Sequence, residues 1–291
     1  YQVLLGSFPP GPLDADALAA YRERIQGYML KAIREAKVET SWVNVNEAYE
    51  EAMRQFVDGL LAGPERNLFL DDFRAAAGSV AWFGLLNSVA MALIKVASPG
   101  VPDLYQGNEV FDFSLVDPDN RRPVDYARRS ALLERFEREL SADGDGLDAR
   151  VARLFAAPDD GGPKLYVLWR GLGLRRDDPE LFRRGSYTAV SAAGAQADHV
   201  VAFARRHEGR GLIAIASRLH YTLVEKPGRL PCGADVWGDT QAMLPFVADG
   251  TRLTDALSGR TLVVRDGGIA LAEAFAAFPG ALLRYTEGGG A

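Results

Sequence analysis

The sequence is poor in the residues that form disulfides and metal sites. It has one cysteine, Cys232, so no disulfide can form within the chain, which agrees with a reducing cytoplasmic compartment. Its three histidines, His199, His207 and His220, match no metal-ligand spacing, and we interpret them as surface or turn residues. We therefore expect no metal site and no cofactor.

Positive charge is also scarce. Lysine and arginine number 33 against 39 aspartate and glutamate residues, which gives a net charge of −6. A nucleic-acid partner needs a broad basic surface to meet its phosphates, so the composition argues against such a partner. With 48% hydrophobic and 25% charged residues, the chain has the composition of a globular protein.

The sequence lacks a convincing membrane span. The length of its most apolar run, 80–97, is close to the lower limit for a helix that crosses about 30 Å of hydrocarbon. The run also contains the polar residues Asn87, Ser88 and Lys95. We expect a buried helix there and no membrane partner. The chain opens on Tyr1 without a methionine, a basic leader or a cleavage site, so we expect an interior segment of a longer protein.

Helical periodicity dominates the first 185 residues. From 13 to 38, apolar residues recur at steps of three and four, which places them on one buried face of a helix. These residues are Leu18, Tyr21, Ile25, Tyr28, Met29, Ala32 and Ile33. Further helices are expected at 46–60, where Asn46 is the cap, at 127–140 and at 147–155.

The secondary structure that the sequence predicts changes near Gly185 from helices to strands. Before it, a run from Pro163 favours a helix, although Gly171 and Gly173 leave a strand open. After it, short β-prone runs alternate with glycine-rich turns: SYTAV, HVVAFARR, LIAIAS, RTLVVR and ALLRYT. This pattern predicts an antiparallel β domain over 186–291, preceded by a largely helical region over 1–185.

The stretch from 98 to 126 is where we expect the functional site. Pro99 and Gly100 end the apolar helix, and 101–105 is short enough for a buried strand. Polar residues then follow at the strand's C-terminal end. In α/β barrels the loops at that end converge and carry the chemistry.

Several segments resemble one enzyme family. PGVPDLYQGNE resembles the last barrel strand of the α-amylase family of glycoside hydrolases and transferases. DPDNRRPVDY resembles the maltooligosyl trehalose synthases within that family. Five more segments agree: KAIREAKVETSW, YEEAMRQF, LRRDDPELFRRGSYTAV, HVVAFARR and FPGALL.

The resemblance implies an α/β plus β fold, namely the last part of a (β/α)8 barrel with helical insertions, followed by an antiparallel C-terminal β domain. It implies an intramolecular glucosyltransferase that isomerises the reducing-end α-1,4 bond of a maltooligosaccharide to the α,α-1,1 bond of trehalose. The implied partner is a maltooligosaccharide or other α-glucan. Another α-amylase-family hydrolase or transferase is the alternative within the same resemblance.

The catalytic groups of such an enzyme are not found in this chain. Retaining glycosyl transfer uses two carboxylates about 5 to 5.5 Å apart, one as nucleophile and one as acid and base. By resemblance, they lie on earlier barrel strands, in motifs that include a His-Asp pair. No His-Asp pair occurs here, so we assign no catalytic residue and expect the catalytic carboxylates outside this chain.

The remaining polar groups suit the wall of a sugar site, because buried sugar hydroxyls must recover hydrogen bonds lost to water. The substrate-binding candidates are Gln106, Glu109, Asp117, Asp119, Asn120, Arg121 and Trp42.

Most of these residues can instead have a structural role, in which they stabilise the loop and do not contact a substrate. DPDN is a turn-forming string whose side chains can bond their own backbone, and Arg121 can pair with Asp119 to stiffen the loop. For Glu109 structure is favoured over substrate contact, whereas for Asp117, Asn120 and Arg121 substrate contact is favoured.

Trp42 has two open interpretations. Its ring can stack on a sugar, because the apolar face of a pyranose packs on an aromatic face. Its ring can instead wedge two helices together.

A function of another class is also open. The chain can be a non-catalytic α-glucan-binding module whose β region carries an aromatic platform, for which Trp237 and Tyr221 are the candidates.

Overall fold

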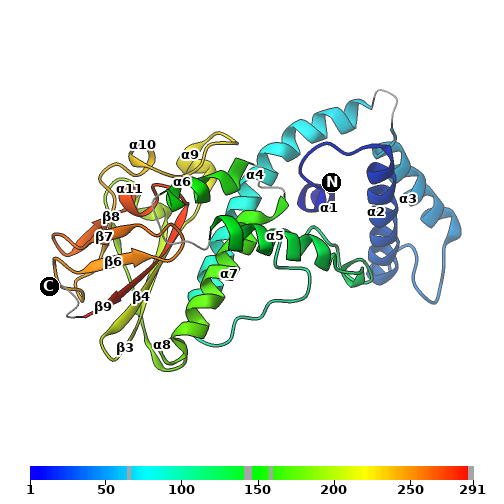
Figure 1. The fold of residues 1–291 in the computed structure, drawn as a ribbon. Coiled ribbons are helices and arrows are strands. Elements are labelled where there is room, and N and C mark those ends of the chain that lie inside the picture. Colours follow the sequence, from blue (N-terminus) through cyan, green and yellow to red (C-terminus); the bar gives the residue numbers. More distant parts are fainter. Residues whose placement is uncertain (64–66, 141–145, 157–159, 288–291) are drawn as a thin grey trace. The chain divides into compact units, whose positions relative to one another are not determined.

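The computed structural model describes residues 1–63, 67–140, 146–156 and 160–287 (Figure 1). The fold separates into two compact units. The first contains residues 1–81 and 112–124, and the second contains residues 82–111 and 125–291.

The first unit is helical. It contains α1 (Gln2–Ser7), α2 (Ala15–Ala36), α3 (Glu47–Leu60) and the beginning of α4 (Leu68–Ala97). Asp14 caps α2 by accepting a hydrogen bond of 2.8 Å from the Ala17 amide. Asn46 caps α3, as predicted, and its side chain accepts from the Tyr49 amide at 3.2 Å. Each cap satisfies an amide that the first helical turn leaves without a partner.

The apolar face of α2 forms the core of this unit. Leu18, Tyr21 and Ile25 are buried, as the periodicity predicted, and they pack with apolar residues of α1, α3 and α4. The Tyr21 hydroxyl lies 2.8 Å from Ser7 Oγ, so the polar end of the ring is satisfied inside the core.

The second unit begins with helices. It contains the rest of α4, then α5 (Tyr126–Glu139), α6 (Leu147–Ala152), the 3₁₀ turn η2 (Arg153–Ala156), α7 (Gly162–Asp177) and α8 (Pro179–Arg184). The strand that the sequence left open after Pro163 is therefore a helix. Gly171 has a packing reason there, since a Cβ atom on it would lie 2.4 Å from Val96 Cγ2 of α4. Most of the SADGDG turn (141–145) and the first two residues of PDDGGP (158–159) lie outside the described residues.

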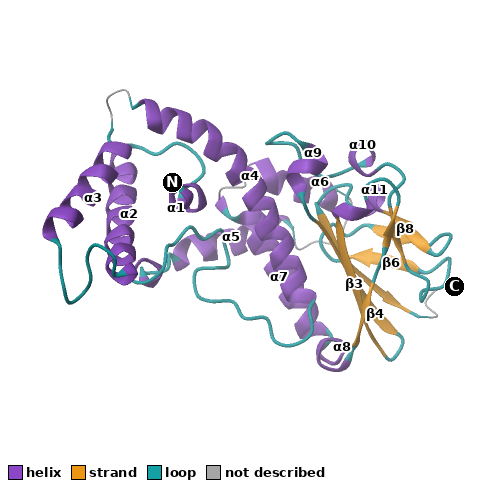
Figure 2. Ribbon diagram, turned by 180° about the vertical axis from the view of Figure 1, so that it is seen from behind, coloured by secondary structure: helices purple, strands orange, loops and turns teal. Residues whose placement is uncertain are grey.

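Two antiparallel sheets follow the helices (Figure 2). The larger has the order β1-β3-β4-β9-β6-β7, formed by β1 (Ser186–Ala189), β3 (Val200–His207), β4 (Arg210–Ser217), β9 (Gly280–Thr286), β6 (Arg252–Asp255) and β7 (Thr261–Val263). The smaller has the order β2-β5-β8, formed by β2 (Ala192–Ala193), β5 (Gln241–Met243) and β8 (Gly268–Ala270). All five predicted strand runs contain strands, and every pairing is antiparallel.

Short elements join the strands: η4 (Ala197–His199), α9 (His220–Val224), α10 (Ala234–Trp237) and α11 (Leu271–Ala274). Strand structure begins at Ser186, which lies within the second compact unit. The division into domains of 1–185 and 186–291 stays a prediction.

The buried strand predicted over 101–105 is wrong. The structure has irregular backbone there, and the side chain of Val101 is 93% exposed. A strand forms only when a neighbouring strand pairs with its amides and carbonyls, and within the described residues none lies beside this segment. An apolar run alone therefore did not determine strand structure.

One helix among the described residues, α4, meets the length and hydropathy criteria for a membrane span, criteria that core helices also meet. Its second half places Leu86, Leu93 and Val96 in the core of the second unit, each no more than 2% exposed. Met91 is 67% exposed. The prediction of a buried helix is thus confirmed for the core-facing residues.

A buried carboxyl group connects β6 with β9. Asp255 accepts hydrogen bonds from the amides of Leu257, Ser258 and Leu282 at 3.1, 3.0 and 3.0 Å, and from Ser258 Oγ at 2.5 Å. Its burial raises the pKa of this carboxyl, while these four bonds oppose the shift.

Asp255→Ala should destabilise the chain by about 3 to 5 kcal/mol, because three buried amides lose their acceptor at once. Urea denaturation of the chain and the variant measures this difference. Asp235→Ala, at an exposed position of α10, is the control and should change stability by less than about 0.5 kcal/mol. A loss below about 1 kcal/mol for Asp255→Ala would show that water replaces the carboxyl group.

Candidate functional site

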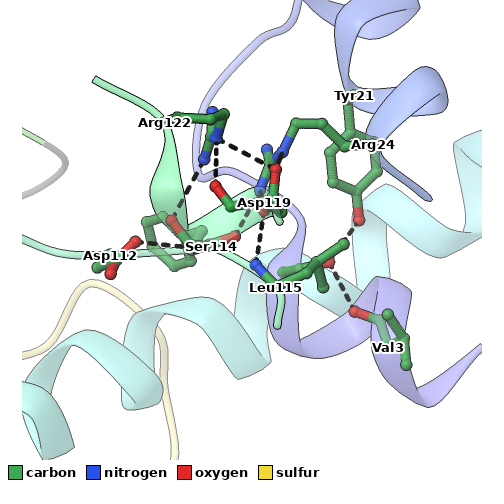
Figure 3. A network of polar contacts seen from close by, with 10 residues as sticks. Val3, Tyr21, Arg24, Asp112, Ser114, Leu115, Asp119 and Arg122 are labelled. Atoms are coloured by element: carbon green, nitrogen blue, oxygen red, sulfur yellow. Dashed lines mark hydrogen bonds and ion pairs between the residues drawn. The ribbon is translucent and has the colours of Figure 1, made fainter. Parts of the chain in front are cut away.

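The loop over 112–122 is held on α2 by a bidentate ion pair (Figure 3). Arg24 Nε and Nη2 donate to the two carboxylate oxygens of Asp119 at 2.8 and 2.9 Å, and Nη2 also donates to the Phe113 carbonyl at 2.7 Å. The Leu115 amide donates to Asp119 Oδ2 at 2.6 Å. Asp119 is therefore a bonded structural residue of the loop.

The electrostatics of Asp119 agree with this role. Burial on its own would raise the pKa of the carboxyl, but the Arg24 bond and the Leu115 amide stabilise the charged form, and the pKa is lowered overall. Arg122 adds an ion pair at 3.1 Å and donates to Ser114 Oγ at 3.3 Å.

Asp117 contacts α2 through Lys31, about two helical turns beyond Arg24. Lys31 Nζ donates to Asp117 Oδ1 and to the Asp117 carbonyl, both at 2.9 Å. The hydrogen bond and charge of Lys31 lower the pKa of the Asp117 carboxyl. Arg121 Nη2 lies 3.4 Å from Asp117 Oδ2, and the Arg121 side chain is 71% exposed. Arg121 thus pairs with Asp117, whereas the sequence suggested Asp119.

Asn120 is exposed in the 3₁₀ turn η1 (Asp119–Arg121). Asp117, Asn120 and Arg121 therefore form the accessible part of this loop, while Asp119 forms its anchor.

Trp42 lies in a separately ordered turn between α2 and α3. Arg34 donates to both carboxylate oxygens of Glu50, at 2.8 and 2.6 Å, and Thr40 Oγ1 donates to Glu50 Oε1 at 2.7 Å. Thr40 Oγ1 in turn accepts from the Asn46 amide at 3.0 Å. The Arg34 guanidinium lies 4.9 Å from the centre of the Trp42 ring.

This arrangement excludes one interpretation of Trp42. The side chain is 56% exposed, so the ring does not wedge the two helices together. Arg34 lies over the ring and is itself paired with Glu50. Much of the ring remains open to solvent. Trp42 therefore presents an exposed aromatic ring that contacts Arg34.

Sequence analysis did not identify the three cations of α2 as partners of the loops. Arg24, Lys31 and Arg34 are spaced by seven and three residues, so they share one face of the helix. For Arg34, the sequence favoured a solvated face of alternating charge shared with Glu35 and Lys37, whereas the structure pairs Arg34 with Glu50. The spacing of these cations matches no spacing of the acidic residues in DPDN and YEEAMRQF, because the paired residues lie 16, 86 and 95 positions apart in the chain.

Gln106 and Glu109 belong to the second unit, in the turn that follows the irregular segment. Glu109 Oε2 accepts from Arg129 Nε at 2.9 Å and from the Gly107 amide at 3.1 Å, and Arg129 Nη2 donates to the Gly107 carbonyl at 2.6 Å. These bonds support the structural role favoured for Glu109. Gln106 is exposed.

The predicted site residues are therefore divided. Five candidates lie in the first unit: Trp42, Asp117, Asp119, Asn120 and Arg121. Helix α2 supplies the partners of Asp117, Asp119 and Trp42, and Arg121 pairs with Asp117. The other two lie in the second unit. Each group is ordered by bonds within its own unit.

The aromatic platform proposed for the β region is wrong in one of its two members. Trp237 is fully buried and donates its indole N–H to the Pro231 carbonyl at 2.9 Å, so no ligand reaches its ring. Tyr221 is 64% exposed, and its ring packs edge-on against Phe83. A lone exposed tyrosine gives weak support to a separate glucan-binding module.

His220 also differs from the expectation of a surface or turn residue. It is 2% exposed, its Nε2 lies 2.9 Å from Ser217 Oγ, and its Nδ1 lies 3.0 Å from Asn87 Oδ1. Burial lowers the pKa of its imidazole to about 4, so the ring is neutral at pH 7. Ser217 Oγ also donates to the Pro279 carbonyl at 2.9 Å, so the group joins α4, β4 and the start of β9 as a structural connection.

Metal and thiol chemistry find no support in the part of the chain that the structure describes. It has no group of three or more His, Cys, Asp or Glu side chains placed to hold a metal ion. Burial raises the pKa of the Cys232 thiol to about 12, so this residue is not a thiolate nucleophile at neutral pH.

Arg24→Ala should loosen the loop over 112–122, because Asp119 loses its bidentate partner and Phe113 loses a donor. Hydrogen exchange at the Leu115 amide should accelerate by about tenfold to a hundredfold, the equivalent of one charge-assisted bond. Arg22→Ala is the matched control on the same helix, since Arg22 forms a more exposed pair with Asp58 at 3.3 Å. Equal effects of the two changes would contradict the role given to Arg24.

The pair between Arg34 and Glu50 should show a defined pH dependence. The Arg34 bond chiefly lowers the pKa of Glu50 from 4.5 to about 2, with burial opposing it. A folded-state pKa below the unfolded value contributes stability above pH 4.5, and this contribution is lost as the pH falls toward 2. The stability difference between the chain and its Glu50→Gln variant should therefore be constant above pH 4.5 and narrow below it.

Denaturant midpoints measured between pH 7 and pH 2.5 test this dependence. Glu51→Gln, at an exposed neighbouring position of α3, should give a small difference that does not follow the same curve. If the stability difference between the chain and Glu50→Gln stays constant down to pH 2.5, the Arg34 pair does not lower the pKa of Glu50.

Comparison with known proteins relates the chain to one group of enzymes. No protein-family model matches it. A protein of Mycobacterium tuberculosis that carries the maltooligosyl trehalose synthase name is 36% identical over 272 residues, which are 94% of this chain and 29% of that protein.

Solved structures agree. The maltooligosyltrehalose synthase from Arthrobacter ramosus is 36% identical, with a TM-score of 0.74 over 98% of this chain and 32% of that enzyme. A further maltooligosyl trehalose synthase crystal structure is 26% identical, with a TM-score of 0.68 and the same coverage of 98% and 32%. This chain thus spans about a third of the length of the relatives that it matches, and its resemblance to the maltooligosyl trehalose synthases is confirmed in both sequence and fold.

Proposed function

We propose that this chain is the C-terminal part of an enzyme that isomerises the reducing-end α-1,4 bond of maltooligosaccharides to the α,α-1,1 bond of trehalose. The observation that carries this proposal is the similarity to maltooligosyl trehalose synthases over 94% of the chain in sequence and 98% in fold. Within the complete protein, residues 1–185 supply the last elements and the helical insertions of a (β/α)8 barrel. Residues 186–291 supply a C-terminal β domain.

The catalytic carboxylates lie outside this chain in the proposed enzyme. The acidic candidate residues of this chain already have partners: Asp119 with Arg24, Asp117 with Lys31 and Glu109 with Arg129. A nucleophile and an acid must instead face the scissile bond from opposite sides of the sugar. The role left to this chain is to bind and orient the glucan.

The binding role falls on the accessible groups. Trp42 offers a ring face on which a pyranose can stack, and Arg34 holds this ring in place. Asp117, Asn120 and Arg121 offer an acceptor, an amide and a guanidinium on one ordered turn, with Gln106 as a further candidate in the second unit. Asp119 and Glu109 act as braces that fix these loops.

Isomerisation makes a particular demand on such a site. The glucose released from the α-1,4 bond must stay bound and turn before its anomeric hydroxyl attacks the glycosyl intermediate, and bulk water must be kept out meanwhile. An ordered loop of hydrogen-bonding side chains meets that demand better than a mobile one, because it has already lost its conformational entropy. We place this enzyme in the cytoplasm, since a chain with one cysteine has no intrachain disulfide to require an oxidising compartment.

The 291-residue chain alone should not convert maltopentaose to a non-reducing product. Ordered wall residues cannot replace a covalent nucleophile and its acid. A reducing-sugar assay with the purified chain measures this, and the complete protein serves as the positive control. Conversion by the chain alone would show that the catalytic carboxylates lie within it.

Asp117→Ala and Arg121→Ala, each made in the complete enzyme, should lower isomerisation by roughly tenfold to a hundredfold while lowering hydrolysis less. Free glucose should therefore rise as a fraction of the product. Chromatographic separation of trehalosyl product from glucose gives the ratio, and Arg229→Ala, at an exposed position of the second unit, is the control. If a folded variant keeps the wild-type ratio of trehalosyl product to glucose, the substituted residue only stabilises the loop and does not bind the substrate.

A further inference from the structure

A groove of about 610 Å³ lies over one face of the larger sheet in the second unit. Its floor is formed by β4, β9 and β6, which are adjacent in the sheet, and its wall by α7 and α8. Leu174, Leu181 and Phe182 supply the apolar part of the wall. The volume falls within the range of small-molecule sites.

Strand register places three arginines together on this floor. Arg284 of β9 lies opposite Leu212 on one side and Thr254 on the other. Arg210 lies two residues from Leu212 on β4, and Arg252 lies two residues from Thr254 on β6. Both are therefore diagonal neighbours of Arg284 on the same face of the sheet. Diagonal neighbours have side chains about 7 to 8 Å apart at their base, within the reach of long side chains.

The charges of this floor are only partly balanced. Arg210 Nη1 pairs with Asp178 Oδ1 at 3.0 Å. Within the described residues, neither Arg252 nor Arg284 forms an ion pair, and Asp177, which also lines the groove, is paired with Arg176. Two uncompensated guanidinium groups as near neighbours repel each other, so an anion between them would lower the energy of the folded chain.

We propose that this groove binds the phosphate group of a small ligand. Guanidinium groups match the oxygens of a phosphate with paired N–H donors, and a site with two of them suits a dianion better than a neutral sugar. The hydroxyls of Thr254 and Thr286 line the same groove and add donors. The apolar wall can cover the body of a phosphate ester, such as a sugar phosphate.

This site is separate from the proposed glucan-binding loop. Its lining residues all belong to the second unit, between 174 and 286, whereas Trp42 and the loop over 112–122 belong to the first. Phosphate binding does not depend on the trehalose-forming activity, so either inference can fail without the other.

Isothermal titration calorimetry at low ionic strength tests the site. Inorganic phosphate, glucose 6-phosphate and glucose are titrated separately into the 291-residue chain. The two phosphates should bind and glucose should not. Tighter binding of glucose 6-phosphate would assign the groove to phosphate esters, whereas equal affinities would assign it to free phosphate, and both results support a phosphate site.

Arg252→Gln and Arg284→Gln should each raise the dissociation constant for phosphate by about tenfold or more, the effect of one charge-assisted contact. Arg265→Gln, at an exposed arginine outside the groove, is the matched control and should leave it unchanged. Circular dichroism confirms that each variant is folded.

Three results would overturn the proposal. The first is no phosphate binding by the unchanged chain. The second is an equal loss in Arg265→Gln, which would indicate non-specific charge attraction. The third is loss of binding in the complete protein, which would show that its other segments fill the groove.

Discussion

The order of the first unit depends on ion pairs along one face of α2. The most fully bonded of these joins Arg24 to both carboxylate oxygens of Asp119, with the side chains only 17% and 10% exposed. Partly buried bidentate pairs of this kind are stronger and more specific in geometry than exposed ones. Without it, the loop over 112–122 would have few bonds to hold its backbone, because the loop has no regular secondary structure beyond one 3₁₀ turn.

The glucan-binding role proposed for this unit depends on which side chains the ion pairs use and which they leave accessible. Asp119 and Glu50 are almost covered by their arginines and serve as supports. Arg121 and Trp42 are more than half exposed, and they contact Asp117 and Arg34 respectively. A binding surface gains affinity when its side chains are ordered in advance, since the entropy cost is met during folding.

In the second unit, buried polar side chains rather than surface ion pairs fix the positions of neighbouring segments. Asp255, Trp237 and the connection between His220 and Ser217 all lie inside the core, and each satisfies backbone groups that would otherwise be buried without partners. Its larger sheet carries exposed arginines on the face toward α7 and α8, so polar function there lies outside the core.

Local patterns in the sequence were sufficient for much of the fold. The periodicity of α2, the Asn46 cap and the five strand runs depend on neighbours within a few residues, so they were predictable. The seven candidate residues were also found from local polarity and resemblance, although their roles as contact or support could not be separated at that stage.

The tertiary structure decided the rest, because each remaining feature depends on a partner distant in the chain. Arg24 and Asp119 are 95 residues apart, and Asn87 and His220 are 133 apart. Trp237 and Val101 have ordinary sequence contexts, yet one is fully buried and the other almost fully exposed. The sequence alone was sufficient for the main helices, for the five strand runs after Gly185 and for the resemblance to the maltooligosyl trehalose synthases. Only the folded chain determined which charges pair and which aromatic rings reach solvent, since burial and ion pairing arise when distant segments pack together.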